Sequence, residues 1–300
     1  MAEQTVLVVG AGAWGTALAN VFARAGTRAL LWDKDAATLA AMAATRHHPR
    51  FSPTVTLDPG VTPLACLAEA GMPDSAVFVV PFQALRAALA EVFAACPGLP
   101  TVACASKGFE LDSQLMAHEI VQSEHPGLPF AQLSGPNFAG EVMHGRPAAL
   151  TIGASTAALG RQFVQAMHGP AFRPYYTDDV IGVEVGGALK NVIAIAAGIA
   201  DGLVLGSNTR AALITRGLAE IARLGVARGG RMETFMGLSG MGDLVLTCTD
   251  DQSRNRRFGM ALARLGRIEE ASAAEALWSR ASRRPMPCAR WRRGLVSRCR

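Results

Sequence analysis

Spacings that build metal centres and disulfide frameworks are missing from this sequence. The 300 residues include six cysteines but no Cys-x-x-Cys pair, and six histidines of which only His47 and His48 are neighbours. Adjacent side chains point to opposite sides of a strand, or about 100° apart on a helix, so these two histidines are not expected to share one ion. The sequence therefore predicts no metal site and, in a reducing compartment, no disulfides.

Long apolar runs are also missing. A membrane-spanning helix needs about 18 or more consecutive apolar residues, and the longest candidate, Val192 to Leu205, is rich in alanine and glycine and is interrupted by Asp201. The first residues, Met-Ala-Glu-Gln, lack the basic region of a signal peptide, so the apolar stretch Val6–Val9 is predicted to be a first strand. We therefore expect a cytoplasmic protein without a membrane span.

Acidic residues are absent from the segment 280–300, which holds eight arginines. The net charge of the whole chain is +5, and without this segment it is −3. The excess of basic charge thus belongs to the C-terminal segment, and the rest of the chain lacks the alternating basic and aromatic residues expected of a nucleic-acid surface. We expect no nucleic-acid partner.

The first part of the chain has the pattern of a doubly wound α/β fold. Half of all residues are hydrophobic and 18% are charged, as in ordinary globular proteins, and 300 residues favour two domains. Apolar runs alternate with segments of helical periodicity, which is typical of a parallel sheet covered on both faces. We predict a Rossmann-type dinucleotide-binding domain over residues 1–179. Its predicted strands are Val6–Val9, Ala29–Trp32, Ala76–Val80, Thr101–Ala105, Phe130–Leu133, Ala148–Ile152 and Phe172–Tyr176.

After Asp179 the pattern changes to helices. Segments 181–205, 209–224 and 230–235 carry apolar residues at helical spacing without strand-like runs, which predicts an all-helical substrate domain over residues 180–270. A ligand cleft is expected between the two domains. Residues 271–300 include Pro285 and Pro287 and lose this periodicity, so we expect an atypical Arg-rich tail outside the fold and an incomplete helical domain.

A glycine-rich turn follows the first predicted strand directly. Gly10, Gly12 and Gly15 form a Gly-x-Gly-x-x-Gly motif that opens a helical run, the context in which this motif binds the pyrophosphate of a dinucleotide. Asp33, at the end of the second strand, is suited to the ribose hydroxyls of NAD, whereas Lys34 beside it is suited to the 2′-phosphate of NADP. The choice between the two cofactors stays open at this point.

Three other segments carry candidate catalytic residues. Lys190 lies in an apolar helix, where burial would lower its pKa and make it a usable proton donor. Lys107 follows a predicted strand end, and the segment 253–257 combines a serine, an asparagine and arginines suited to phosphate oxygens. Each also has an alternative without a functional role. Lys190 also fits a structural lysine with an exposed end, Lys107 a solvated loop, and the segment 253–257 a solvated surface segment.

Six separated motifs together resemble one family. They occur in order between residue 5 and about residue 265, namely Gly10–Gly15, Ala105–Gly108, Ser134–Ala139, Gly186–Asn191, Leu213–Gly217 and Gly242–Cys248, the last continuing through Arg257. This set closely resembles bacterial NAD(P)-dependent sn-glycerol-3-phosphate dehydrogenase. The resemblance implies reversible hydride transfer between NADH or NADPH and dihydroxyacetone phosphate, giving glycerol 3-phosphate for phospholipid synthesis. The oligomeric state stays open, with a homodimer as one option.

The resemblance also implies roles for individual residues. Lys190 is the implied proton donor in reduction and acceptor in oxidation. The implied substrate contacts are Lys107, Gly135, Asn137, Asp243, Ser253, Arg254 and Asn255. The implied cofactor contacts are Gly10, Gly12, Ala13, Trp14, Gly15, Lys34, Lys107, Ala139 and Arg254.

Two departures from the family pattern leave alternatives open. Phe82 replaces a small hydroxyl residue, and a family segment similar to Gly-Gln-Val-Val-Glu-Gly has no counterpart, so the resemblance is expected to end near Gly266. One alternative is a reductase of the same two-domain plan that acts on hydroxyacids or imines, which would not need the segment 253–257. Another is a paralogue that binds NADPH without turnover.

Overall fold

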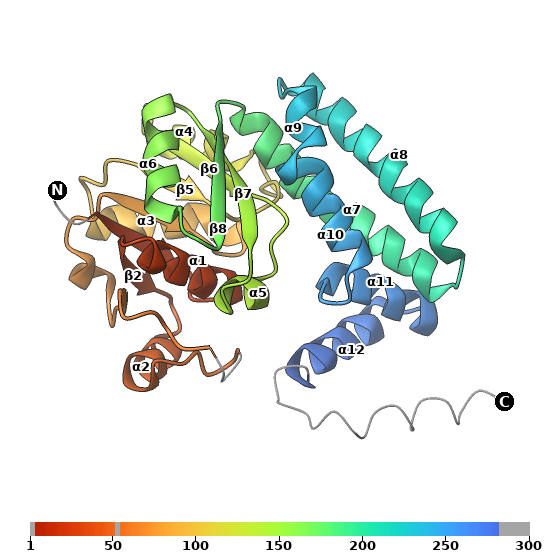
Figure 1. The fold of residues 1–300 in the computed structure, drawn as a ribbon, viewed down its shortest axis with the longest axis horizontal. Coiled ribbons are helices and arrows are strands. Elements are labelled where there is room, and N and C mark those ends of the chain that lie inside the picture. Colours follow the sequence, from red (N-terminus) through yellow and green to blue (C-terminus); the bar gives the residue numbers. More distant parts are fainter. Residues whose placement is uncertain (1–3, 52–54, 282–300) are drawn as a thin grey trace.

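The chain folds into a sheet-containing half and a helical half, joined by one long helix. The structure, a computed structural model, describes residues 4–51 and 55–281. Figure 1 shows the sheet and the helices that cover it at the left, and the helical half at the right. Helix α7 (Val180–Gly202) passes from the sheet half into the helical half. Glu184 of α7 accepts the backbone N–H of His118 at 2.9 Å, which ties the helix to the sheet half.

Eight strands form a single sheet in the order β3-β2-β1-β4-β5-β6-β7-β8. Strands β1 to β6 are parallel, as the alternating pattern predicts, and their order is that of a Rossmann fold. The strands are β1 Thr5–Val9, β2 Arg28–Trp32, β3 Val61–Pro63, β4 Ser75–Phe78, β5 Val102–Cys104, β6 Phe130–Ser134, β7 Ala148–Ala154 and β8 Phe172–Thr177.

Two features of the sheet differ from the prediction. Strand β7 pairs with β6 antiparallel, and β8 follows β7 in parallel. An antiparallel neighbour needs no full crossover, and the connection from β6 to β7 holds only the short helix α5 (Ala139–Met143). Strand β3 was not predicted, because its three residues are too short to show a pattern and gain their strand geometry by pairing with β2.

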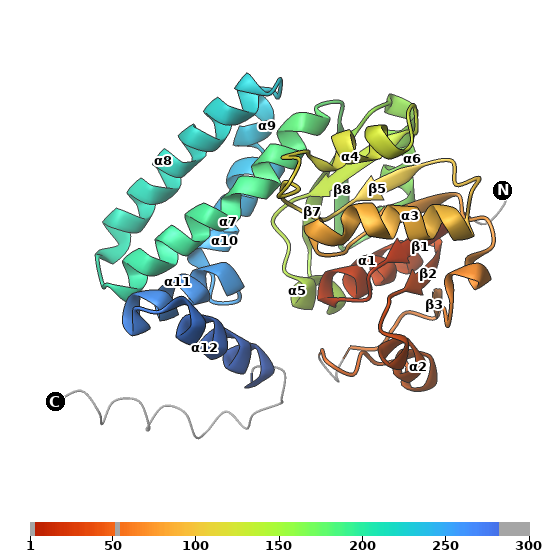
Figure 2. The ribbon, with the colours of Figure 1, turned by 180° about the vertical axis from the view of Figure 1, so that it is seen from behind.

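Helices cover both faces of the sheet, as predicted. Figure 1 shows α1 and α6 on one face, and Figure 2, from behind, shows α3 and α4 on the other. The strands between them are apolar on both sides, and Leu7, Val8, Leu31, Phe78 and Ile152 are at most 1% exposed. Besides α5, the helices of this half are α1 Ala13–Arg24, α2 Ala36–Thr45, α3 Leu85–Ala95, α4 Ala117–Glu124 and α6 Ala157–Met167, with 3₁₀ turns at Leu67–Ala70 and Phe82–Ala84.

The helical half is built around α7. Among the described residues, α7 is the one helix long and apolar enough to cross a membrane, but its small residues pack against α11. A Cβ at Gly198 would lie 2.0 Å from the carbonyl oxygen of Arg256, and a Cβ at Gly259 would lie 2.2 Å from that of Ile195. The composition of α7 thus serves a close helix crossing. The other helices are α8 Gly206–Ala227, α9 Met232–Met236, α10 Asp243–Thr249, α11 Arg254–Leu265 and α12 Ile268–Ala281, with a π turn at Leu238–Gly242.

The expectation that the fold ends at residue 270 is wrong. Helix α12 continues to Ala281, Ala271 is fully buried, and Glu275 accepts a hydrogen bond from Arg257 of α11 at 2.9 Å. The acidic first turn, Glu269 and Glu270, favours a helix start. The arginines and prolines that suggested a tail lie almost wholly beyond this helix, in 282–300, which is outside the described residues.

Arg256 anchors α11 in the interior of the helical half. Its side chain is 9% exposed and donates to Asp201 of α7 at 2.7 Å and to Asp251 at 2.5 Å. We expect Arg256→Met to lower the free energy of unfolding by about 3 kcal/mol, because it leaves the buried Oδ2 of Asp201 without this partner. Urea unfolding followed by circular dichroism measures this loss.

The matched control is Arg216→Met on α8. Arg216 pairs with Glu220, but the two side chains are 74% and 52% exposed. Such a surface pair contributes at most about 1 kcal/mol. Equal losses for the two variants would contradict the anchoring role of Arg256.

Candidate active site between the two halves

The glycine-rich turn between β1 and α1 has the geometry that a dinucleotide needs. Gly10 has a φ of +110°, and a Cβ there would lie 2.6 Å from the carbonyl oxygen of Val79. A Cβ at Gly15 would lie 1.8 Å from the carbonyl oxygen of Gly10, whereas one at Gly12 would meet nothing within 4 Å. The first and third glycines therefore permit the close turn, and the second leaves the backbone open to approach.

The N-terminus of α1 is suited to an anion, since none of the described side chains caps it. Gly12 is the N-cap, no side chain caps the helix, and the first turn holds no acidic residue. The helix dipole and the unpaired amides at this end, which includes Ala13 and Trp14, favour a negatively charged group. A pyrophosphate fits both this charge and the open space over Gly12.

Ala11 holds this turn from two sides. Its N–H donates to Oδ2 of Asp33 at 2.7 Å, and its carbonyl oxygen lies 2.7 Å from Nε2 of His48. Because Nδ1 of His48 accepts the N–H of Arg50 at 3.1 Å, Nε2 carries the hydrogen and donates it to Ala11. Burial lowers the pKa of His48, which favours this neutral form. Sequence reasoning missed His48 in this role, since nothing in the sequence marks its contact with Ala11.

Lys34 follows Asp33, whose carboxylate holds the glycine-rich turn. It follows β2 and is paired with Glu91 of α3, with 3.1 Å between Nζ and Oε2. Lys34, Lys107 and Lys190 are the only lysines of the chain. The other two meet at the junction of the two halves.

Two lysines share one carboxylate at this junction. Lys107 in the loop after β5 donates to Oδ2 of Asp243 at 2.5 Å, and Lys190 in the middle of α7 donates to Oδ1 of the same residue. Asp243 begins α10 and its side chain is 2% exposed, while those of Lys107 and Lys190 are 20% and 12% exposed. Two ammonium groups and one carboxylate leave a net positive charge in a shielded place, which favours an anionic ligand.

The surroundings of Lys190 lower its pKa to about 8. Burial is the main cause, since the ammonium loses hydration, and the positive charge of Lys107 adds to it. The carboxylate of Asp243 acts in the opposite direction without cancelling these effects. A lysine with this pKa can both donate and accept a proton near neutral pH.

Thr247 completes the hydrogen bonding of Lys190. Its Oγ1 accepts from Lys190 Nζ at 3.0 Å and donates to the carbonyl oxygen of Asp243 at 2.6 Å. Sequence reasoning did not assign a role to Thr247. The spacing of four residues from Asp243, which puts both side chains on one face of a helix, is the signal that could have identified it.

The end of β6 and the loop after it carry buried polar atoms, of which Ser134 Oγ lies near Lys107 across Gly187. Asn137 donates through Nδ2 to the carbonyl oxygen of Ala149 at 2.8 Å, and its Oδ1 is buried without a hydrogen-bond partner in the described part of the chain. Ser134 Oγ is likewise buried and unpaired, and it lies 2.8 Å from where a Cβ of Gly187 would stand. At Gly135 a Cβ would lie 2.8 Å from the Cα of Leu150. Unpaired buried oxygens are uncommon in folded proteins because they lose the hydrogen bonds they make to water.

The segment 253–257 divides into two groups. Arg256 and Arg257 are held by carboxylates of their own half, Asp201 and Glu275 among them. Arg254 is exposed and has no ion-pair partner among the described residues. The predicted phosphate cluster therefore reduces to Ser253, Arg254 and Asn255.

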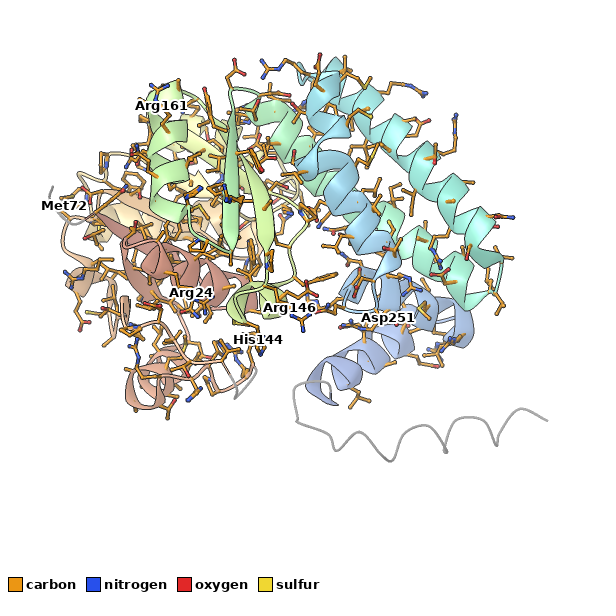
Figure 3. The ribbon with its side chains drawn as sticks, in the orientation of Figure 1. Arg24, Met72, His144, Arg146, Arg161 and Asp251 are labelled. Carbon is orange, nitrogen blue, oxygen red and sulfur yellow. The ribbon has the colours of Figure 1, made fainter. Side chains whose placement is uncertain are left out.

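These three residues begin α11. Ser253 is its N-cap and accepts the N–H of Arg256 at 3.2 Å, and Asn255 donates to Asn191 at 2.7 Å, next to Lys190 in the chain. The preceding Gln252 donates to Glu141 of α5 at 3.0 Å. Figure 3 shows Asp251 and Arg146 on the sides of the two halves that face each other at this contact. The start of α11 thus lies at the junction.

Phe82 and Ala139 lie on the sheet side of the junction. Gly108 has a φ of +147°, and a Cβ there would lie 3.2 Å from the ring of Phe82. Phe82 therefore packs over the residue that follows Lys107. Ala139 is the first residue of α5 and packs against the core of the sheet half.

Comparison with known proteins gives matches over both halves. The family model described as NAD-dependent glycerol-3-phosphate dehydrogenase N-terminus matches residues 5–159, and the one described as its C-terminus matches residues 179–280. The expected end of the resemblance near Gly266 is therefore corrected, because the match includes nearly all of α12.

Individual relatives agree with these matches. Glycerol-3-phosphate dehydrogenase [NAD(P)+] of Thioalkalivibrio sulfidiphilus is 49% identical over 91% of this chain and 83% of its own length. The protein of the same name from Rhodospirillum rubrum is 51% identical over 86% of this chain and 74% of its own length. The crystal structure of glycerol-3-phosphate dehydrogenase from Coxiella burnetii is 39% identical and superposes with a TM-score of 0.86, covering 92% of this chain and 87% of that one.

Proposed function

The chain belongs to the NAD-dependent glycerol-3-phosphate dehydrogenase family, and we propose that the site at its junction interconverts dihydroxyacetone phosphate and sn-glycerol 3-phosphate. The observation that carries this proposal is the contact of Lys107 and Lys190 with Asp243, which joins the two halves around a titratable ammonium. We include in the proposal a cytoplasmic location and a supply of glycerol 3-phosphate to phospholipid synthesis.

Residues of the first half fit a nicotinamide dinucleotide. The open backbone at Gly12 and the uncapped start of α1 suit its pyrophosphate, and the carboxylate of Asp33 suits ribose hydroxyls. Cofactor contacts by Trp14, Ala139 and Lys34 are part of the proposal. When bound, NADH or NADPH supplies the hydride for the carbonyl carbon of the substrate.

Lys190 is the proposed proton donor for reduction. Negative charge builds on the carbonyl oxygen as the ketone is reduced, and a nearby ammonium stabilises that charge and then donates its proton to the oxygen. In the reverse direction the neutral amine of Lys190 accepts the hydroxyl proton. Thr247 and Asp243 hold the amine in place during both steps.

The start of α11 is the proposed binding site for the substrate phosphate. Arg254 offers a guanidinium that pairs with no carboxylate of the described residues. Ser253 and Asn255 add polar groups at a helix N-terminus, where anions are favoured. Lys107, Gly135 and Asn137 are proposed to contact the substrate from the sheet half. The net positive charge around Asp243 attracts the dianionic phosphate.

The test is an assay of the purified chain with dihydroxyacetone phosphate and either NADPH or NADH, followed by nicotinamide absorbance. We expect turnover with at least one cofactor and none with dihydroxyacetone phosphate omitted. Cofactor binding without turnover would instead support a paralogue that has lost activity. Preference for a hydroxyacid or imine substrate would overturn the proposed substrate.

Gly12→Ala separates cofactor binding from folding. A Cβ at Gly12 meets no protein atom within 4 Å, and its φ of −68° is ordinary for alanine, so we expect the free energy of unfolding to fall by no more than about 1 kcal/mol, the cost of alanine at a helix N-cap. The added methyl group would occupy the space proposed for pyrophosphate. We expect the dissociation constants of NADH and NADPH, measured by fluorescence titration, to rise at least about tenfold.

A further inference from the structure

A pocket lies beside the C-terminal end of β2, at the place where Rossmann folds hold the adenosine ribose. It is formed by the end of β2, the segment that follows β3, and one side of α3, which Figure 2 shows next to the β1 and β2 side of the sheet. Its lining includes Trp32, Asp33, Lys34, Cys66 and Glu91.

Three of these residues are charged. Asp33 is held by the backbone, whereas Lys34 and Glu91 pair with each other. Asp33 accepts backbone N–H groups with both oxygens, from Ala11 at 2.7 Å and from Asp35 at 2.9 Å, so its position is fixed by the backbone. Lys34 is the one cation in the lining, and its Nζ lies 3.1 Å from Oε2 of Glu91. Arg50, a second cation near the end of β2, lies 3.2 Å from Asp35.

We propose that Glu91 is a specificity-determining residue that reduces the affinity for NADPH relative to NADH by pairing with Lys34. The 2′-phosphate of NADPH needs a cation near the end of β2, and Lys34 supplies it only after leaving Glu91. NADH carries a hydroxyl group at this position, which the carboxylate of Asp33 can accept without any such exchange. The inference rests on the proposed function, which supplies the dinucleotide as the ligand.

Glu91 belongs to α3 and not to the turn after β2 where this choice is usually made. Its side chain is 40% exposed and that of Lys34 is 66% exposed, so the pair is weak and can exchange partners. A lysine binds as a point charge and does not hold two anions in a fixed fork, so Glu91 and a phosphate compete directly for it. We expect the effect to be about three- to fivefold at low ionic strength and smaller at high salt.

The experiment compares Glu91→Gln with the unchanged chain. The dissociation constants of NADPH and NADH are measured by fluorescence titration, and those of adenosine 2′,5′-bisphosphate and AMP by calorimetry. We expect NADPH and the bisphosphate to bind about three- to fivefold more tightly to the variant, while NADH and AMP change by less than about twofold. An unchanged ratio of the NADPH and NADH constants would overturn the proposal.

Two further variants test whether Glu91 changes the NADPH affinity through Lys34. In a chain that already carries Lys34→Gln, the change Glu91→Gln must lose its effect on NADPH, and an equal effect there would overturn the role of the pair. Glu220→Gln on α8 makes the same chemical change at an exposed, ion-paired glutamate of the other half and should leave both constants unaltered. Because cofactor binding is measured without substrate, the comparison of NADPH and NADH remains valid even if the chain does not reduce dihydroxyacetone phosphate.

Discussion

Lys190→Met lowers kcat for reduction of dihydroxyacetone phosphate by at least about 10³-fold and leaves the dissociation constants of NADH and NADPH within about twofold. The variant removes the group that stabilises and protonates the substrate oxygen. It does not leave a buried charge unpaired, because Asp243 keeps its contact with Lys107. Stopped-flow or steady-state absorbance measures kcat, and fluorescence titration measures cofactor binding.

Lys190→Arg is the matched variant for charge. A guanidinium keeps the positive charge but does not release a proton near neutral pH, so this variant should also be slow. Retention of more than about a tenth of kcat in either variant would remove Lys190 from the proton-transfer role.

The same lysine sets the expected dependence on pH. Reduction uses the ammonium form of Lys190, whose pKa is lowered to about 8, so kcat for reduction should be level below that pH and fall above it. Oxidation uses the neutral amine, so its rate should rise with pH and become level above about pH 8. Opposite slopes that meet near this pH would support one shared group.

Arg254→Ala raises KM for dihydroxyacetone phosphate by about 30-fold or more, which corresponds to about 2 kcal/mol for a charged hydrogen-bond partner. The change in kcat should be smaller, since the residue is proposed to bind the phosphate in the ground state and the transition state alike. The slow reduction of unphosphorylated dihydroxyacetone should be unaffected, because it lacks the group that Arg254 is proposed to bind.

Arg264→Ala provides the control for Arg254. Arg264 is exposed on the last turn of the same helix α11, ten residues further along the chain. It should leave KM unchanged. An unchanged KM for Arg254→Ala as well would remove the phosphate site from the start of α11 and favour a reductase of the same fold with another substrate.

The fold could be predicted where local patterns carry the information. Strands β1, β2 and β4 are apolar after their first residue, so their burial on both faces is visible in the sequence. The direction of β7 and the existence of β3 depend on which neighbour is available for pairing, which no local pattern expresses. The helical pattern of α12 is hidden in the sequence because the arginines and prolines that follow it dominate the composition of 271–300.

The sequence indicates candidate site residues one by one but does not show which of them contact each other. Lys107, Lys190 and Asp243 were each identified, yet their meeting on one carboxylate joins positions up to 136 residues apart. Arg254, Arg256 and Arg257 are the same residue type in one segment. Only the placement of Asp201 and Glu275 decides that Arg256 and Arg257 are structural while Arg254 is left without an ion-pair partner among the described residues.

The lysine content of the chain has a consequence for spectroscopy. Of 29 lysines and arginines, only Lys34, Lys107 and Lys190 are lysines, and all three belong to the candidate site. Methylation of these amines with ¹³C-labelled formaldehyde would therefore give one lysine resonance per position, beside that of the N-terminal amine. Because arginine carries the positive charge elsewhere, these resonances would report protonation and ligand binding at the site without background from the rest of the surface.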